Sequence, residues 1–193
     1  MSDRTATAGP VQSGDDDLFT QLYRRHYRPI RDFCRRRVAT DLVDDAVAET
    51  FLTAWRRLAD VPAGDEALLW LYKVAYRVVG HQWRGTARRR RLEGRLQSVA
   101  SLSAAAADEF VIDDGECRLV LAAAQQLGNT DAEVLRLSAW EQLSIGDTAA
   151  VLGIAPNAVK QRLHRARRNL AREYRRLESQ KASTPDAPEG GIP

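Results

Sequence analysis

The feature that most constrains the fold is a segment without lysine or arginine, in a chain that is otherwise rich in arginine. The chain has 193 residues, with 29 Lys and Arg against 26 Asp and Glu. Residues 96–117 carry only acidic charges, set among alanine and serine. This composition predicts a flexible acidic linker. The chain is therefore expected to form two small domains, each with a modest core.

Before the linker, apolar residues recur at the spacing of amphipathic helices. Pro29 is expected to kink or restart the first helix, because proline supplies no N–H and clashes with the preceding turn. Residues 1–14 are small and polar and are expected to form a disordered arm. The expected helices cover residues 15–38, about 41–58, and about 66–84 or beyond, with a loop at 60–65.

After the linker, two short patterns predict helix starts. Thr130 with Glu133, and Ser144 with Asp147, each have the spacing of a capping box, in which two side chains satisfy free backbone N–H groups. Between and after them, glycine and proline mark further boundaries. These boundaries are Gly128 with Asn129 and Gly153 as helix ends, and Pro156 as the first residue of a last helix that runs to about Leu177.

No strand pattern stands out, so the predicted fold class is all-α, with two small helical domains. The first domain is expected at 15–95 and the second, which contains a helix-turn-helix, at 116–177. The acidic linker is placed at 96–115, and a disordered tail at 178–193.

Composition gives no support to an enzyme. The cysteines, Cys34 and Cys117, are far apart and form no CxxC, so both are interpreted as reduced core thiols. The three histidines are scattered, and neither a metal nor a cofactor is expected. No apolar run approaches the ~18–20 residues of a membrane span, and the N-terminus lacks a signal-peptide pattern, so we expect a cytoplasmic protein without membrane contact.

The short helix before Gly153 and the last helix form a helix-turn-helix candidate. The polar face of the last helix carries side chains that pair with base edges, since Lys and Arg suit guanine and Asn and Gln suit adenine. These side chains are Asn157, Lys160, Gln161, His164, Arg165 and Arg168. Arg162 and Arg167 are expected to contact phosphates. The alternative is an ordinary basic face of an amphipathic helix.

The stretch 143–167 resembles the promoter-reading helix-turn-helix of extracytoplasmic-function sigma factors of bacterial RNA polymerase. That family typically has a Leu-Gly-Ile turn and a Val-Lys-x-Arg-Leu-x-Arg-Ala-Arg recognition helix, which this chain matches at 152–154 and 159–167. Ala155 departs from the usual Ser or Cys and forfeits a helix cap of ~1 kcal/mol. The resemblance implies minus-thirty-five recognition. Helix-turn-helix domains of response regulators look similar, so this motif alone leaves a regulator open.

The stretch 42–55 is similar to the polymerase-binding helix of the same family, D-x-V-Q-E-T-F-L-x-A-W, with Ala48 in place of the usual Gln. The resemblance implies docking on the clamp coiled coil of core RNA polymerase. The residues themselves indicate an acidic patch with small side chains on a basic protein. The expected polymerase-binding residues are Asp44, Asp45, Ala48, Glu49 and Leu52. An ordinary solvated face is the alternative.

The stretch 70–84 resembles the minus-ten-reading helix of the family, although Arg77 stands where Asn is common and His81 where Asp is common. The loop at 60–67 falls where the family holds a flipped-out base. Cations interleaved with aromatic residues suit single-stranded DNA, although core packing is an alternative for Trp70, Tyr72 and Trp83. The expected minus-ten residues are Lys73, Arg77, His81, Trp83, Arg84, Asp60 and Asp65, with Arg88 and Arg89 as a phosphate clamp.

The resemblance covers about residues 15–95 and 116–176 and implies an alternative sigma factor that is not itself an enzyme. It implies these partners: core RNA polymerase through its clamp coiled coil and flap, promoter DNA in duplex and single-stranded form, and an anti-sigma factor. The protein would be a monomer within the holoenzyme. The acidic linker would thread the polymerase cleft, with a solubilising spacer as the alternative. Two rivals are a duplex-binding regulator that works without polymerase, and an interaction protein with an acidic partner.

Overall fold

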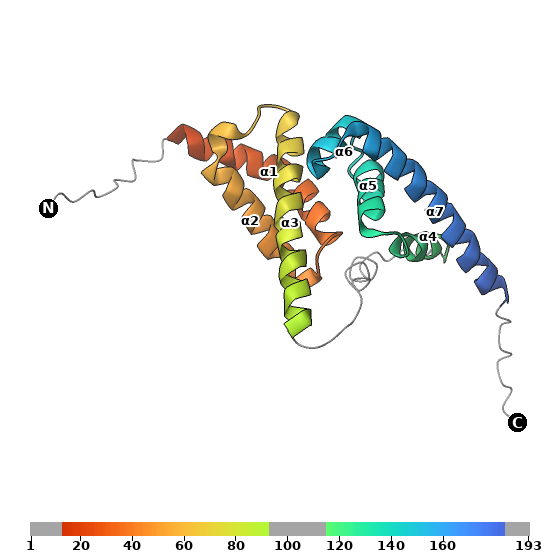
Figure 1. Cartoon of the computed structure of the whole chain (residues 1–193). Helices are drawn as coiled ribbons and strands as arrows, with labels where there is room; N and C mark the ends of the chain where they lie inside the picture. The colour runs from red at the N-terminus through yellow and green to blue at the C-terminus, as the bar shows by residue number, and fades with distance from the viewer. Residues whose placement is uncertain (1–12, 93–114, 184–193) are drawn as a thin grey trace, which may run out of the picture.

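The computed structural model describes residues 13–92 and 115–183, and within these ranges every regular element is helical (Figure 1). The all-α prediction is confirmed. The elements are α1 Ser13–Arg35, η1 Thr40–Leu42, α2 Val43–Arg56, η2 Leu58–Asp60, α3 Glu66–Leu92, α4 Gly115–Gln125, α5 Asn129–Ala139, α6 Ile145–Leu152 and α7 Pro156–Ser183. The expected linker up to residue 114, most of the N-terminal arm and the tail from residue 184 lie outside the described residues.

Helices α1, α2 and α3 pack against one another and are called the first domain below. The apolar stripe expected on α2 is buried as predicted, from Val43 to Ala54. The helix α1 continues through Pro29 to Arg35, so the expected restart at this proline is wrong. The first domain presents α3 along the side that faces the rest of the chain (Figure 1).

Helices α4 to α7 form the second domain, in which α4, α5 and α6 all pack against α7. Ser144 caps α6 as predicted, because its Oγ accepts a hydrogen bond from the Asp147 backbone N–H at 3.1 Å. Gly153 ends α6 with a left-handed φ of 67°, a conformation that favours glycine. Pro156 begins α7, also as predicted, but α7 extends to Ser183, six residues beyond the expected end at about Leu177.

The capping box expected at Thr130 is wrong. Helix α5 begins at Asn129, and its N-cap is Gly128, two residues before the expected cap, with no side chain to cap the helix. Glu133 is buried and turned toward the first domain instead of toward the start of its own helix.

The two domains share one hydrophobic core, which the sequence did not lead us to expect. The main apolar cluster of the first domain, centred on Phe33 and Leu71, continues into Leu137 of α5 and Val151 of α6. Helix α6 packs directly on α3, and Figure 1 shows the two helices side by side. The predicted separate cores are therefore joined at this contact.

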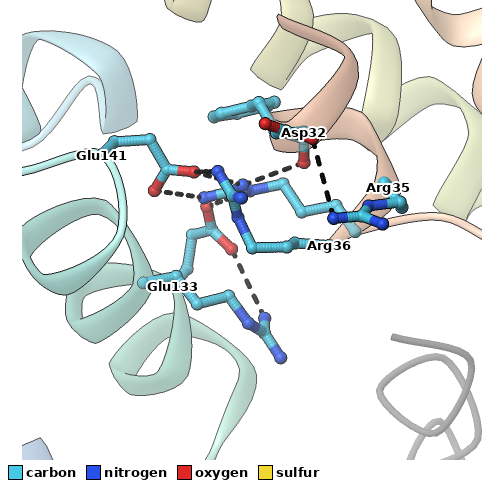
Figure 2. A network of polar contacts seen from close by, with 8 residues as sticks. Asp32, Arg35, Arg36, Glu133 and Glu141 are labelled. Atoms are coloured by element: carbon cyan, nitrogen blue, oxygen red, sulfur yellow. Dashed lines mark hydrogen bonds and ion pairs between the residues drawn. The ribbon is translucent and has the colours of Figure 1, made fainter. Parts of the chain in front are cut away.

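A buried group of ion pairs fastens the same contact; we call Arg36, Arg37, Glu133 and Glu141 the interdomain latch. The side chains of Arg37 and Glu141 have 0% exposure. Arg37 Nε donates to Glu133 Oε1 at 2.7 Å, and its Nη1 and Nη2 donate to the two carboxylate oxygens of Glu141 at 3.0 and 3.2 Å. Arg36 Nη2 donates to Glu141 Oε1 at 2.7 Å. Figure 2 shows both glutamates reaching toward the end of α1.

The Arg37 guanidinium also has contacts within the first domain. Its Nη1 also donates to the Phe33 carbonyl oxygen at 3.0 Å, and the guanidinium lies 3.6 Å from the centre of the Phe33 ring. The backbone carbonyl of Arg37 accepts a hydrogen bond from the Trp83 indole N–H at 2.9 Å. A buried charge with this many partners is tolerated, whereas one deprived of them is strongly destabilising.

We therefore predict that Arg37→Met, which leaves Glu133 and Glu141 buried without their partner, lowers the free energy of unfolding by about 3–5 kcal/mol. The matched control is Arg25→Met, which removes an exposed pair with Asp65 and should cost no more than about 1 kcal/mol. Urea unfolding followed by circular dichroism measures both. Equal losses in the two variants would contradict the central role of Arg37.

The pH dependence of unfolding provides a second readout. Burial alone would raise the pKa of Glu141, but the charges and hydrogen bonds of Arg37 and Arg36 outweigh it and lower this pKa. A lowered folded-state pKa contributes stability above the unfolded value, and this stability is lost as the pH falls through the folded value. Arg37→Met should weaken this acid dependence.

Candidate nucleic-acid interface

The polar face predicted on the last helix is exposed in α7. Val159, Leu163 and Ala166 are buried against the second-domain core, so the opposite side of the helix is directed to solvent. All six expected base-reading residues are on that exposed side: Asn157, Lys160, Gln161, His164, Arg165 and Arg168. Of the two residues expected to contact phosphate, Arg167 is exposed and Arg162 half-buried.

Arg165 is not a free side chain, contrary to what its exposed position suggested. Its Nε donates to Asp131 Oδ2 and its Nη2 to Asp131 Oδ1, both at 2.6 Å. Arg162 lies 3.8 Å from the same carboxylate. Hydrogen bonding from Arg165 lowers the pKa of Asp131. Asp131 was not predicted as part of this face, because nothing in the local pattern of α5 indicates a partner 34 residues further along the chain.

On α3, four of the expected minus-ten residues form one stripe. Lys73, Arg77, His81 and Arg84 are separated by four, four and three residues, which places them on one side of a helix. Arg77, His81 and Arg84 are exposed and Lys73 is half-buried. The expected phosphate clamp at Arg88 and Arg89 is on the α3 backbone, but its side chains lie outside the described part of the chain.

Among the aromatic residues of α3, Trp83 was expected at the minus-ten site, with core packing as the alternative. Trp83 is half-buried, packs on the main core and donates to the Arg37 carbonyl, which favours the packing alternative. Tyr72 and Trp70 also pack in or against this core. Burial raises the pKa of Tyr76, and the nearby charge of Glu133 raises it further, which places Tyr76 close to the interdomain latch.

The two aspartates expected near the minus-ten site already have partners. Arg57 Nε donates to Asp60 Oδ2 at 2.8 Å, and Arg25 Nη2 donates to Asp65 Oδ1 at 3.0 Å. Both pairs are exposed, and exposed pairs contribute little to stability and exchange easily. The structure leaves these aspartates accessible without bringing them together.

The acidic patch expected on α2 is exposed to solvent. All five residues, Asp44, Asp45, Ala48, Glu49 and Leu52, are exposed, while their neighbours on the helix are buried. Leu52 is 45% exposed, which is unusual for leucine in a folded domain and leaves an apolar spot beside the carboxylates. The patch thus combines negative charge, a small residue and an apolar anchor on one helix face.

The remaining chemistry of the described residues is limited. Cys34 is buried, and desolvation raises its pKa to about 12, so its thiol stays protonated and inert; Cys117 is half-buried and also unpaired. No three metal-binding side chains converge within residues 13–92 and 115–183. None of the helices found there has the length and apolar character needed to cross a membrane.

Comparison with family models matches both domains. Residues 22–89 match sigma-70 region 2, and residues 117–170 match sigma-70 region 4. The first match contains α2 and the α3 stripe, and the second contains the helix-turn-helix.

Individual relatives give the same result. The chain is 31% identical over 172 residues to RNA polymerase sigma factor CnrH of Cupriavidus metallidurans, covering 85% of this chain and 90% of the relative. It is 28% identical to ECF RNA polymerase sigma factor SigM of Mycobacterium tuberculosis, covering 83% of this chain and 79% of the relative.

Solved structures support the fold. The sigma factor RpoE in complex with the anti-sigma factor NepR, from Bartonella quintana, matches with a TM-score of 0.67 at 21% identity, covering 81% of this chain and 96% of that one. CnrH in complex with the cytosolic domain of CnrY matches with a TM-score of 0.58 at 24% identity, covering 89% of this chain and 93% of that one.

Proposed function

Because the chain belongs to the sigma-70 family of RNA polymerase sigma factors, in its extracytoplasmic-function group, we propose that its three exposed faces are the working surfaces of promoter recognition. The chain is an alternative sigma factor that directs core polymerase to specific promoters. In the proposal, α7 reads the minus-thirty-five element, α3 captures the minus-ten strand, and α2 docks on core polymerase.

The observation that carries this assignment is the separation of charge between helices. The α3 stripe and the exposed face of α7 are basic, whereas the exposed face of α2 is acidic. Basic faces follow the phosphate backbone of DNA, and an acidic face is repelled by it. The α2 face therefore suits a basic protein surface, such as the polymerase clamp coiled coil, better than it suits DNA.

In α7, the reading residues belong to the first turns of a recognition helix held in place by the Ser144 cap and the Gly153 turn. A helix of this width enters the major groove, where Lys, Arg, Asn and Gln distinguish base pairs. Lys160 and Gln161 are both exposed there. They are among the residues from which we expect direct base contacts.

On α3, the proposed task is to hold a strand that has left the duplex. The stripe from Lys73 to Arg84 offers cations along about three helical turns, and the loop at 60–65 lies at the start of the same helix. Binding unstacked bases and their phosphates offsets the cost of unstacking, which is a few kcal/mol per step. DNA opening then needs no ATP, and the protein acts as a binding factor without catalysing a reaction.

Further partners follow from the same proposal. Of the two structural relatives named above, RpoE was solved with the anti-sigma factor NepR, and CnrH with the cytosolic domain of CnrY. We extend this to the present chain and expect an anti-sigma factor, a cytoplasmic location, a contact of the second domain with the polymerase flap, and a single copy in each holoenzyme.

The polymerase assignment predicts that Asp45→Lys combined with Glu49→Lys abolishes assembly with core polymerase, because the charge of the α2 face is inverted. The folded state should persist, since both side chains are exposed. Size-exclusion co-elution with core polymerase measures assembly. The control is Asp16→Lys with Asp17→Lys, the same charge change on exposed residues of α1, and it should assemble normally. Assembly of the α2 variant at moderate salt would contradict the assignment.

Promoter opening separates this proposal from a duplex-binding regulator that works without polymerase. The holoenzyme should give promoter-specific run-off transcripts and a bubble that permanganate detects. Arg77→Ala with Arg84→Ala should reduce the open complex more than closed-complex binding, because the α3 stripe holds only the melted strand. Mismatches that pre-melt the minus-ten region should partly rescue this variant, and Arg24→Ala, on the exposed side of α1, should behave like the parent protein. A protein that footprints duplex DNA alone and never yields a bubble would be the regulator.

The described arrangement is too compact to contact both promoter elements together. The elements are centred about 25 base pairs apart, or about 85 Å of duplex at about 3.4 Å per base pair. Helix α6 packs on α3 and also on α7, so α3 and the start of α7 lie roughly two helix diameters apart, about 20–24 Å. The two domains therefore have to separate on the promoter, which requires the interdomain latch to open.

This requirement predicts that Glu133→Gln with Glu141→Gln, which neutralises the latch, enlarges the free protein and tightens its binding to core polymerase several-fold. If only molecules with separated domains bind fully, the apparent affinity for core polymerase falls as the fraction of closed molecules rises. Small-angle X-ray scattering measures the radius of gyration, and fluorescence anisotropy measures the affinity. The control Glu173→Gln removes a partly exposed ion pair with Arg176 on α7 and should change neither. An unchanged radius and affinity in the double variant would show that the latch does not limit opening.

A further inference from the structure

We propose that Asp131, which is not on the DNA-reading helix, is a positioning residue for minus-thirty-five recognition because it fixes the guanidinium of Arg165. This inference rests on the proposed role of α7 as the reading helix. Asp131 is in the first turn of α5 and is 8% exposed, while the side chain of Arg165 on α7 is 58% exposed. A buried carboxylate thus binds an exposed arginine that we expect to contact a base.

The geometry of the pair leaves Arg165 able to contact a base. The hydrogen bonds to Asp131 use Nε and Nη2, which form the side edge of the guanidinium, both at 2.6 Å. A guanidinium has five N–H donors, so three remain. The end edge, formed by Nη1 and Nη2, can still pair with O6 and N7 of guanine.

The fixed orientation of Arg165 lowers the conformational entropy that this side chain loses when DNA binds. A free arginine on a helix samples many rotamers and loses that freedom when it pairs with a base. Asp131 orders the side chain before DNA arrives, so less conformational entropy is lost on binding. Asp131 is itself neutralised by Arg165 and by Arg162 at 3.8 Å, which limits its repulsion of nearby phosphates.

A purely structural brace between α5 and α7 is the competing explanation. The apolar cluster of Val134, Ala149, Val159 and Leu163 already joins these helices through buried contacts. The ion pair is at the edge of that cluster, where the arginine remains largely in solvent. The chain therefore has a means of holding α5 to α7 that does not involve Asp131, and the pair is better explained by the orientation it imposes.

The test uses reconstituted holoenzyme and a panel of promoters in which each base pair of the minus-thirty-five element is replaced in turn. Asp131→Asn should reduce discrimination at one base pair about tenfold, within the range for loss of a bidentate contact, and leave the other positions unchanged. Arg165→Ala should lose discrimination at the same base pair, and the double variant should lose no more than Arg165→Ala alone. Asp131→Glu, which keeps the charge, should restore part of the discrimination.

Glu173→Gln is the matched control, because it neutralises a carboxylate paired with an arginine on α7 outside the reading turns. It should leave the whole panel unchanged. Thermal melting of each variant shows whether it is folded at the assay temperature.

Three results would overturn the inference and leave promoter recognition by α7 intact. One is an equal loss on every promoter in Asp131→Asn, as expected for a brace. Another is a loss of discrimination in Arg165→Ala that Asp131→Asn does not share. The last is unchanged discrimination in both variants while Gln161→Ala alters it. If no α7 variant changed discrimination at any position, the proposed function of α7 would fail instead.

Discussion

The structure depends on one guanidinium that has no access to solvent. Arg37, just after α1, is paired with Glu133 of α5 and with Glu141 in the turn before α6, and its carbonyl is bound by Trp83 of α3. Three elements that are distant in sequence are therefore fixed relative to one group. Burying these charges costs hydration, and only the full set of partners offsets that cost. The contact is consequently specific for one arrangement, because a shifted docking would leave a buried charge without a partner.

A charged contact also suits domains that have to separate. When the domains part, Arg37, Glu133 and Glu141 regain hydration, which offsets part of the lost pairing. The apolar part of the contact, around Leu137 and Val151, gains no such compensation. The closed form is thus held by apolar contacts and by ion pairs whose charges regain hydration on opening. A purely apolar interface of the same size would expose a hydrophobic patch in the open state, and such patches favour aggregation.

The parts of the structure that depend on local pattern could be predicted, and those that depend on distant partners could not. The cap at Ser144, the turn at Gly153 and the buried stripe of α2 all follow from residues within a few positions. The pattern of Thr130 and Glu133 predicted a cap equally well, but Glu133 has a buried partner 96 residues away, and that interaction prevails. Trp83 and Asp131 are similar: their partners, Arg37 and Arg165, are set by packing between helices, which helical periodicity does not report. The exposed faces of single helices could therefore be predicted from periodicity, whereas the partners of individual side chains on those faces could not.

The two acids near the start of α5 show how the domain contact and the reading face relate. Asp131 and Glu133 are two residues apart, and on a helix that spacing directs them to nearly opposite sides. One binds Arg165 on α7, and the other binds Arg37 of the first domain. Both carboxylates are close to the helix N-terminus, where the dipole favours negative charge. When the domains separate, Glu133 loses its partner in the first domain, but the pair between Asp131 and Arg165 lies wholly within the second domain. The second domain can therefore move as a unit, and the orientation of its reading face does not depend on whether the latch is closed.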